Sequence, residues 1–217
     1  MKNKVLIIGA GGHARSVLDI LLQNDEYEIV GCIDNAFGKR EVVEGMEEIP
    51  IVGNDNALEE FRNKGIKKIF IAIGSNKLRD ELYDYVSLLG FELINVISSS
   101  AYISPRAKLG NGICVMPGAV INVNAVIEDN CIINTNCSID HDCKIGRSVH
   151  IAPGVAISGT VSIGDRTQVG TGASIIDGIN VGNDAFIGAG AAVVMDIEEY
   201  ALAVGVPARM IKKLKGE

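Results

Sequence analysis

The sequence predicts two domains: an α/β domain with an open parallel sheet over residues 1–100, and an all-β solenoid over residues 101–217 that includes a C-terminal cap. Two observations predict this division. Strand-like and helix-like segments alternate in the first part, whereas aliphatic residues recur every six positions in the second. A chain of 217 residues is long enough for two modest domains, each with its own core.

The repeat runs through sixteen consecutive blocks of six residues, over 103–198, without a change of phase. Each block opens on Ile, Leu or Val, and its fifth residue is small or aliphatic. The fourth residue is Gly, Asn or Asp in twelve of the sixteen blocks, for example Gly118 and Asn124. A period of six fits neither an α-helix nor a simple strand, but it fits a short strand followed by a corner.

In such a repeat the first and fifth residues point inward, and stacked blocks bury them together. Gly, Asn and Asp at the fourth position tolerate the left-handed backbone of a tight corner. The pattern resembles the hexapeptide-repeat left-handed β-helix, in which three blocks form one triangular coil, so sixteen blocks form about five coils. A β-solenoid without chemistry, such as a scaffold, is the alternative.

The first domain opens with a buried strand over 5–8, a glycine turn and a helix with one apolar side. The turn matches the pattern G-x-G-x-x-A at Gly9, Gly11 and Ala14. This pattern brings bare backbone and the amides of a helix N-terminus close to an anion. By itself it is weak evidence, since it also fits NAD binding, and His13 directly after the glycines is not part of the usual NAD pattern.

Two further strands end in loops that suit a ligand. The strand over 28–33 ends at Asp34 and Asn35, where a carboxylate can accept hydrogen bonds from a ribose, although Asp is also an ordinary turn residue. The strand over 68–73 ends at Gly74, before a helix. A last strand over 91–97 precedes a serine run at the domain boundary. These elements predict a small Rossmann-like sheet with a ligand site at one edge.

Composition limits the classes of partner. The formal net charge of −7 argues against a nucleic-acid binder, which usually carries a basic face. No apolar run approaches the ~20 residues of a membrane span, so no membrane partner is expected. The N-terminal residues run directly into a strand rather than a signal peptide, and we therefore expect a cytoplasmic protein.

The five cysteines lack CxxC spacing. Cys131, Cys137 and Cys143 fill the inward fifth position of three consecutive blocks. We expect them to be small core residues, because free Cys packs as a small hydrophobe; a thiolate metal site is the alternative. The solenoid has only two histidines, at poor spacing, whereas a zinc enzyme usually needs three protein ligands, so we predict no metal.

The densest polar run of the solenoid contains His141 and Asp142 at the third and fourth positions of one block. An imidazole with a pKa of about 6.5 suits proton transfer at neutral pH, and an adjacent carboxylate can fix its tautomer. His150 follows nine residues later, half of an eighteen-residue coil, so the two histidines are expected on different sides of one chain. The alternatives are an ordinary corner residue for Asp142, a solvated corner histidine for His141, and a histidine without a functional role for His150.

The C-terminal end, Gly205 to Arg209, is followed by Lys212, Lys213 and Lys215. This segment predicts either a cap on the last coil or a basic rim for a phosphorylated ligand.

Together, these motifs resemble the sugar O/N-acyltransferases of the sialic acid O-acetyltransferase type. The nearest resemblance is to the bacillosamine-type N-acetyltransferases, which modify UDP-linked 4-amino-sugars. The residues that carry it span both domains: Gly9-Ala-Gly11-Gly12-His13, Phe70-Ile-Ala-Ile-Gly74-Ser-Asn76, Ile133-Asn134-Thr135, Ile139-Asp140-His141-Asp142 and Gly205-Val-Pro-Ala-Arg209. The resemblance implies an acetyl-CoA-dependent homotrimer with active sites between subunits.

The resemblance also implies roles for individual residues. His141 falls on the general base, and Asp142 on the acidic residue that raises its basicity, which is Glu in the bacillosamine-type enzymes. Asn134 falls near the acceptor amine. The positions implied to contact acetyl-CoA are His150, Gly159, Thr171 and Ala189. The positions implied to bind the sugar nucleotide are Gly11, Gly12, His13, Asp34, Asn35 and Gly74.

We therefore expect transfer of an acetyl group from acetyl-CoA to the amine of a nucleotide-linked amino-sugar, with UDP as the expected nucleotide. A sugar O-acetyltransferase of the sialic acid type is the first alternative, and a non-catalytic binding or scaffold solenoid is the second. An NAD-dependent enzyme is a more distant one.

Overall fold

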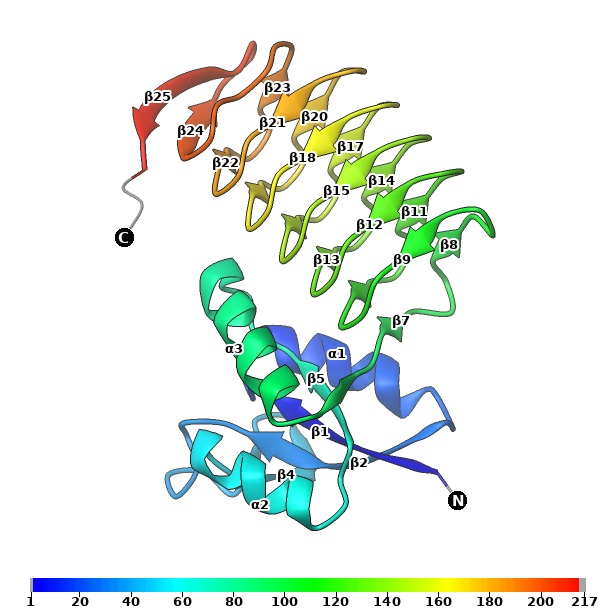
Figure 1. The fold of residues 1–217 in the computed structure, drawn as a ribbon, viewed down its shortest axis with the longest axis vertical. Coiled ribbons are helices and arrows are strands. Elements are labelled where there is room, and N and C mark those ends of the chain that lie inside the picture. Colours follow the sequence, from blue (N-terminus) through cyan, green and yellow to red (C-terminus); the bar gives the residue numbers. More distant parts are fainter. Residues whose placement is uncertain (1, 215–217) are drawn as a thin grey trace. The chain divides into compact units, whose positions relative to one another are not determined.

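The computed structural model describes residues 2–214. Met1 and residues 215–217, which include the predicted rim residue Lys215, lie outside the described part. The chain forms two compact units, Met1–Val96 and Ile97–Glu217 (Figure 1). Within the described residues, no helix is both long enough and apolar enough to cross a membrane.

The first unit contains a six-stranded sheet in the order β3-β4-β2-β1-β5-β6. β1 pairs in parallel with β2 and β5, and only β3 and β4 pair in antiparallel fashion in this sheet. The strands are β1 (Asn3–Ile8), β2 (Tyr27–Ile33), β3 (Val42–Val43), β4 (Met46–Gly53), β5 (Lys68–Ile71) and β6 (Glu92–Leu93). The helices are α1 (Gly12–Leu22), the 3-10 helix η1 (Asp55–Ala57), α2 (Leu58–Asn63) and α3 (Asn76–Leu88).

The predicted Rossmann-like sheet is confirmed. The central strand β1 is buried on both faces, as expected for parallel sheets; its Leu6 and Ile8 pack in one cluster with residues of α2 and α3. β1, β2 and β5 run parallel, so their carboxyl ends share one edge. The N–H of Gly9 donates to Ile33 O, and the N–H of Ala72 donates to Ile8 O, both at 2.8 Å.

The prediction of a single strand over residues 91–97 is wrong, because the structure has two short strands there, in different sheets. β6 extends the sheet of the first unit, whereas β7 (Val96–Ile97) is the edge strand of a solenoid sheet. The N–H of Ile94 donates to Ile69 O at 3.1 Å, and that of Ser98 donates to Val115 O at 2.9 Å. The sequence did not reveal this division, because an apolar run that supplies strands to two successive sheets has the same residue pattern as one longer strand.

The second unit is a parallel β-helix. Its sixteen two-residue strands, β8 to β23, each end on the opening residue of a block. Each strand pairs in parallel with the strand eighteen residues away, as Cys114 pairs with Ile132. The strands form three sheets, which we name faces 1, 2 and 3 in the order in which the chain meets them, and we name each corner by the two faces that it joins.

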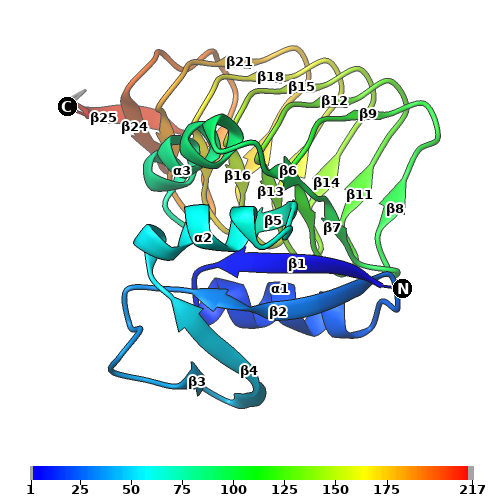
Figure 2. The same cartoon turned by 60° about the horizontal axis from the view of Figure 1, so that its bottom comes forward.

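Face 1 consists of β7, β10 (Cys114–Val115), β13 (Ile132–Ile133), β16 (His150–Ile151), β19 (Gln168–Val169), β22 (Phe186–Ile187), β24 (Ala201–Val204) and β25 (Arg209–Lys213). Face 2 consists of β8 (Tyr102–Ile103), β11 (Val120–Ile121), β14 (Ser138–Ile139), β17 (Ala156–Ile157), β20 (Ser174–Ile175) and β23 (Ala192–Val193). Face 3 consists of β9 (Lys108–Leu109), β12 (Val126–Ile127), β15 (Lys144–Ile145), β18 (Ser162–Ile163) and β21 (Asn180–Val181) (Figure 2).

The first and fifth residues of the blocks form one continuous core along the coils. The three cysteines predicted to be core residues are free and fully buried in it. Burial raises the pKa of the Cys137 thiol to about 12 and that of the Cys143 thiol above its usual range. The cysteines are therefore packed as neutral thiols, which confirms their prediction as small core residues.

The fourth residues of the blocks form the corners in the left-handed conformation. All fourteen from Gly112 to Gly190 have φ between +54° and +72°. Ser148, Thr160 and Arg166 adopt this conformation although their residue types did not predict it. The stack of coils therefore imposes the corner geometry even where the local residue does not favour it.

The C-terminal segment closes face 1. β24 pairs in parallel with β22, and β25 returns antiparallel to β24. Ala203 and Ala208 are buried in the solenoid core, whereas Lys212 and Lys213 are exposed.

Candidate active site

His141 lies at corner 2/3, two residues after the end of β14. The next residue, Asp142, is the left-handed corner residue, with φ of 59°. Both side chains are about half exposed, at 52% and 48%. The turn therefore directs a histidine and a carboxylate from adjacent positions toward each other and toward solvent.

The imidazole Nδ1 and the carboxylate Oδ2 of Asp142 are 2.8 Å apart. Because an ionised carboxylate only accepts hydrogen bonds, Nδ1 carries a proton, and in the neutral imidazole Nε2 keeps its lone pair. The hydrogen bond that His141 donates to Asp142 raises the pKa of His141 above its ordinary value, and the neighbouring charge of Asp140 adds to the increase. Hydrogen bonds from Asn124 and His141 lower the pKa of Asp142. The structure thus brings the predicted base and its predicted partner into contact.

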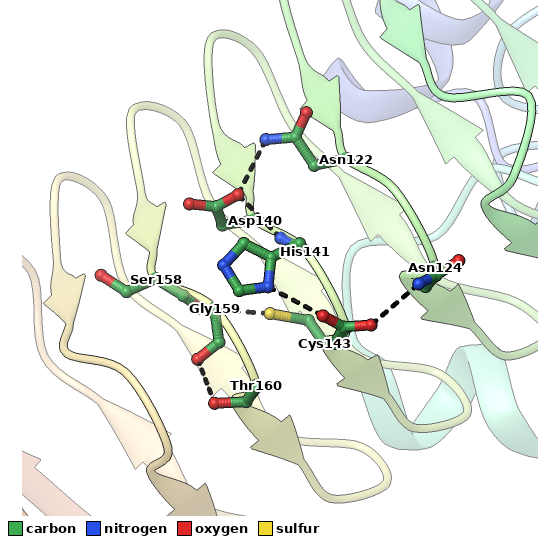
Figure 3. A network of polar contacts seen from close by, with 9 residues as sticks. Asn122, Asn124, Asp140, His141, Cys143, Ser158, Gly159 and Thr160 are labelled. Atoms are coloured by element: carbon green, nitrogen blue, oxygen red, sulfur yellow. Dashed lines mark hydrogen bonds and ion pairs between the residues drawn. The ribbon is translucent and has the colours of Figure 1, made fainter.

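Two asparagines of the preceding coil hold the carboxylates on either side of His141 (Figure 3). Nδ2 of Asn122 donates to Oδ1 of Asp140, and Nδ2 of Asn124 donates to Oδ1 of Asp142, each at 3.0 Å. Oδ1 of Asp140 also accepts the backbone N–H of His141 at 2.7 Å. Sequence reasoning did not select Asn122, Asn124 or Asp140 as site residues, although each asparagine stands eighteen residues before its carboxylate.

Gly159 lies one coil after His141, against its ring (Figure 3). A Cβ at Gly159 would lie 2.5 Å from Cε1 and 2.6 Å from Nε2 of the imidazole. The N–H of Thr160 donates to His141 O at 2.9 Å, and its hydroxyl donates to Gly159 O at 2.7 Å. Gly159 therefore gives the ring the space that it occupies, a role that the sequence did not predict.

A second polar group lies at corner 1/2, where Asn134 follows β13 and His150 belongs to β16. The N–H of Thr135 donates to Oδ1 of Asn134 at 2.8 Å, which identifies the amide oxygen. Nδ2 of Asn134 therefore faces Nε2 of His150, at 3.1 Å. Since Nδ2 can only donate, Nε2 accepts, and His150 is a neutral imidazole with its proton on Nδ1.

The predicted solenoid residues thus fall into two groups at two corners. His141, Asp142 and Gly159 lie at corner 2/3. Thr171, after β19, and Ala189, after β22, share corner 1/2 with Asn134. Face 2 separates the two corners in one chain, as the nine-residue spacing of the histidines implies.

In the first unit, the predicted glycines lie where strands end. Gly11, which has no side chain, holds the N-cap position of α1, and an added Cβ at Gly11 or Gly74 would meet nothing within 4 Å. Open space next to bare backbone and to the amides of a helix N-terminus suits an anion. Asn35, in the turn after β2, is exposed.

Asp34 has a structural task at this edge. One carboxylate oxygen accepts the N–H of Ala10 at 2.8 Å, and the other accepts the N–H of Ala36 at 2.7 Å. Asp34 therefore ties the glycine turn to the end of β2. Each oxygen keeps a second lone pair, so this task leaves acceptor capacity for a ligand.

His13 lies in the first turn of α1, and its pKa is lowered to about 4, chiefly by burial and also by the charge of Arg79. Arg79 is itself 1% exposed and donates to the carbonyls of Ile73 and Gly74 at 3.0 and 3.3 Å. His13 is therefore neutral at pH 7. Arg79 was not predicted, because no motif marks a buried arginine that organises the loop after β5.

Comparison with known proteins finds a matching family model in each of the two units. Residues 4–86 match the PglD N-terminal domain, and residues 124–159 match the bacterial transferase hexapeptide, six repeats. The chain is 30% identical over 176 residues to the GDP-perosamine N-acetyltransferase of Escherichia coli O157:H7, covering 78% of this chain and 76% of that protein. It is 35% identical over 117 residues to the UDP-N-acetylbacillosamine N-acetyltransferase of Bacillus subtilis (strain 168), covering 54% of this chain.

The chain spans 52% of the Bacillus protein, and 20% of an uncharacterized protein of Acanthamoeba polyphaga mimivirus that is 35% identical over 109 residues. Among solved structures, PerB from Caulobacter crescentus in complex with CoA and GDP-perosamine has a TM-score of 0.90 and 41% identity, covering 96% of this chain and 97% of that one. The acetyltransferase domain of PglB from Neisseria gonorrhoeae FA1090, in complex with acetyl coenzyme A, has a TM-score of 0.90 and 33% identity, covering 97% and 100%.

The fold and these matches define a hexapeptide-repeat acyltransferase, in which a Rossmann-like domain precedes a left-handed parallel β-helix. More specifically, the chain belongs to the family of PglD-type nucleotide-sugar N-acetyltransferases, which includes the bacillosamine and perosamine enzymes.

Gly159→Ala is expected to displace the imidazole of His141. Gly159 is not among the residues with positive φ, so the added methyl group collides with the ring without straining the backbone. We expect acetyl transfer to fall at least about tenfold, because small misplacements of a reacting group are costly. Turnover and a crystal structure of the variant test this, with Ser158→Ala at the same corner as the control. Full activity with an unmoved ring would contradict the expected clash.

Proposed function

We propose that this protein transfers the acetyl group of acetyl-CoA to the amine of an amino-sugar that is linked through a diphosphate to a nucleoside. The observation that carries the proposal is the His141–Asp142 pair, which presents an imidazole with a free Nε2 at an open corner. The relatives support the acceptor and donor, since those named act on UDP-N-acetylbacillosamine and GDP-perosamine and the solved ones hold CoA or acetyl coenzyme A.

In the proposed step, the lone pair of the amine attacks the thioester carbonyl carbon, and the π electrons of that bond move to its oxygen. Nε2 of His141 takes the proton that the nitrogen loses. When the tetrahedral intermediate collapses, the C–S bond breaks, and the CoA sulfur receives the proton from His141. The products are the amide and free CoA, so atoms and charge balance.

Asp142 stabilises the imidazolium that forms during this step, as the carboxylate of a catalytic triad does. A backbone N–H next to the ring, that of Gly159, is the proposed donor to the developing oxyanion. His150, Thr171 and Ala189 at corner 1/2 are the proposed contacts of acetyl-CoA, and Asn134 the proposed contact near the acceptor.

The first unit is the proposed site for the nucleotide diphosphate. The amides at the start of α1 and the bare backbone at Gly11, Gly12 and Gly74 suit phosphate oxygens. Neutral His13 can donate or accept one hydrogen bond there, and Asp34 and Asn35 are placed for the nucleoside. UDP remains a prediction, because two relatives that match more of the chain carry GDP-linked perosamine in their names.

A homotrimer is the proposed assembly. Within one chain, face 2 lies between His141 and the group of Asn134 and His150, so one chain alone does not bring them together. The outward residues of face 2 after Tyr102 are small or β-branched: Val120, Ser138, Ala156, Ser174 and Ala192. Three copies with these faces toward a common axis would bring corner 2/3 of one chain against corner 1/2 of the next. A groove of about 750 Å³ on this unit lies along face 3 instead and is lined by neither histidine.

A substrate panel tests the proposed reaction. UDP- and GDP-linked amino-sugars and their hydroxy-sugar counterparts are incubated with acetyl-CoA, and release of free CoA is measured. We expect saturable release with an amino-sugar linked to one of the two nucleotides. Release with hydroxy-sugars alone would identify an O-acetyltransferase instead, and no release with any acceptor would indicate a non-catalytic solenoid.

His141→Ala is expected to lower kcat by about a hundredfold or more, since no other group then takes the proton. In the wild type, kcat should fall with decreasing pH through an apparent pKa above 6.5, because Asp142 raises the pKa of the base. Stopped assays over a pH series measure both effects, and light scattering confirms that the assembly is intact. A variant with the full rate would show that His141 is not the base.

Complementation tests whether each site is shared between chains. His141→Ala and His150→Ala subunits are co-expressed, so that mixed trimers form. If one chain supplies corner 2/3 and its neighbour corner 1/2, about a quarter of the interfaces combine both intact histidines at random mixing. We expect turnover well above that of either variant alone. Activity no greater than the average of the two would mean that each chain builds its own site.

A further inference from the structure

A ladder of side chains crosses from one coil to the next at corner 2/3 and ends on the imidazole of His141 (Figure 3). Asn124 and Asp142 occupy the same block position one coil apart, with nearly equal φ values of 60° and 59°. Equal backbone conformations at stacked positions point the two side chains in the same direction. Nδ2 of Asn124 therefore reaches Oδ1 of Asp142 at 3.0 Å.

This contact divides the carboxylate of Asp142 between two partners. Oδ1 receives the amide of Asn124, and Oδ2 receives Nδ1 of His141 at 2.8 Å. A side chain that is 48% exposed would otherwise rotate freely into water and be solvated there. With Oδ1 fixed on the preceding coil, Oδ2 remains directed at the ring.

A purely structural ladder is the competing explanation, since asparagine commonly forms left-handed corners. Asn130 provides the comparison: it has φ of 63° at the same block position, and its Nδ2 donates to the hydroxyl of buried Ser148 at 2.8 Å. There, the ladder joins two coils inside the protein. At corner 2/3 the acceptor is an exposed carboxylate whose other oxygen binds the imidazole, so the same device acts on a reactive group.

We propose that Asn124 is a positioning residue, which holds the carboxylate of Asp142 against Nδ1 of His141. It thereby keeps the proton of the neutral ring on Nδ1 and directs the basic Nε2 for proton transfer. This inference rests on the proposed function of His141 as the base. The repeat pattern alone would mark Asn124 only as a corner residue, whereas the inference gives it a role in orienting His141.

The surroundings of His141 determine the sign of the expected effect. Its own corner contributes Asp140, Asp142 and the thiol of Cys143, whereas the preceding coil contributes Asn122 and Asn124 and the following coil Gly159 and Thr160. Loss of the Asn124 amide leaves the carboxylate less stabilised and free to turn into solvent. The pKa of Asp142 then rises, and the pKa of His141 falls toward that of a free imidazole.

The test is an NMR pH titration of the histidine ring signals in Asn124→Gly. Glycine keeps the left-handed corner and removes only the amide, and the chain has three histidines, so His141 is assigned by its absence in His141→Ala. We expect the pKa of His141 to fall by about half a unit or more. Asn136→Gly is the matched control, since Asn136 has φ of 55° at the same block position but belongs to corner 1/2, and it should leave this titration unchanged.

Kinetics provide the second measurement. We expect Asn124→Gly to lower kcat about fivefold, with the acid limb of the pH profile displaced to lower pH and KM for acetyl-CoA unchanged. If Asn124→Gly misfolds, Asn124→Ser replaces it, because Ser148 shows that serine adopts this corner. An unchanged His141 titration, or an unchanged kcat, would overturn the inference. Failure of the proposed function appears separately, as full turnover in His141→Ala.

Discussion

The second unit depends on one constraint, the parallel pairing of residues eighteen positions apart. Each two-residue strand bonds to the strands of the coils before and after it, as Ile132 pairs with Cys114 and with His150. A single coil has too little core to be stable, so every block must keep the register of its neighbours. The fourteen left-handed corners follow from this register, because the chain must turn at the same place in each coil.

The same register builds the site from residues that are distant in sequence. A residue at a corner contacts the residues eighteen before and eighteen after it, so the surroundings of His141 come from Asn124, through Asp142, and from Gly159. One coil supplies the hydrogen bond that orients the carboxylate, and another supplies the space for the ring. The side chain of His141 is therefore surrounded by residues of the coils before and after it, and we expect substitutions one coil away to act on it.

The repeat made the solenoid predictable in detail, because its phase fixes which residues point inward and where the chain turns. Prediction was less complete where tertiary structure determines the backbone conformation. Ser148, Thr160 and Arg166 adopt the left-handed conformation at corners because the stacked coils require it. The run over 91–97 divides between two sheets for the same reason. His141 and Asp142 were recognisable as neighbours, whereas Asn124 required the additional step of counting one coil back. Arg79 had no signal, since its burial depends on how α3 packs.

The edge of the first sheet, where we propose that the diphosphate binds, combines a helix N-terminus with a buried guanidinium. The N-terminus of α1 carries a partial positive charge, and the guanidinium of Arg79, although buried, reaches His13 strongly enough to help lower its pKa. Both act in the same direction, against a proton on His13. In a protein with a net charge of −7, the buried guanidinium of Arg79 thus lies at the same edge as the carboxylate of Asp34. A diphosphate bound at this proposed site would reduce the cost of protonating His13, so its binding should raise the pKa of that imidazole from about 4 toward neutrality.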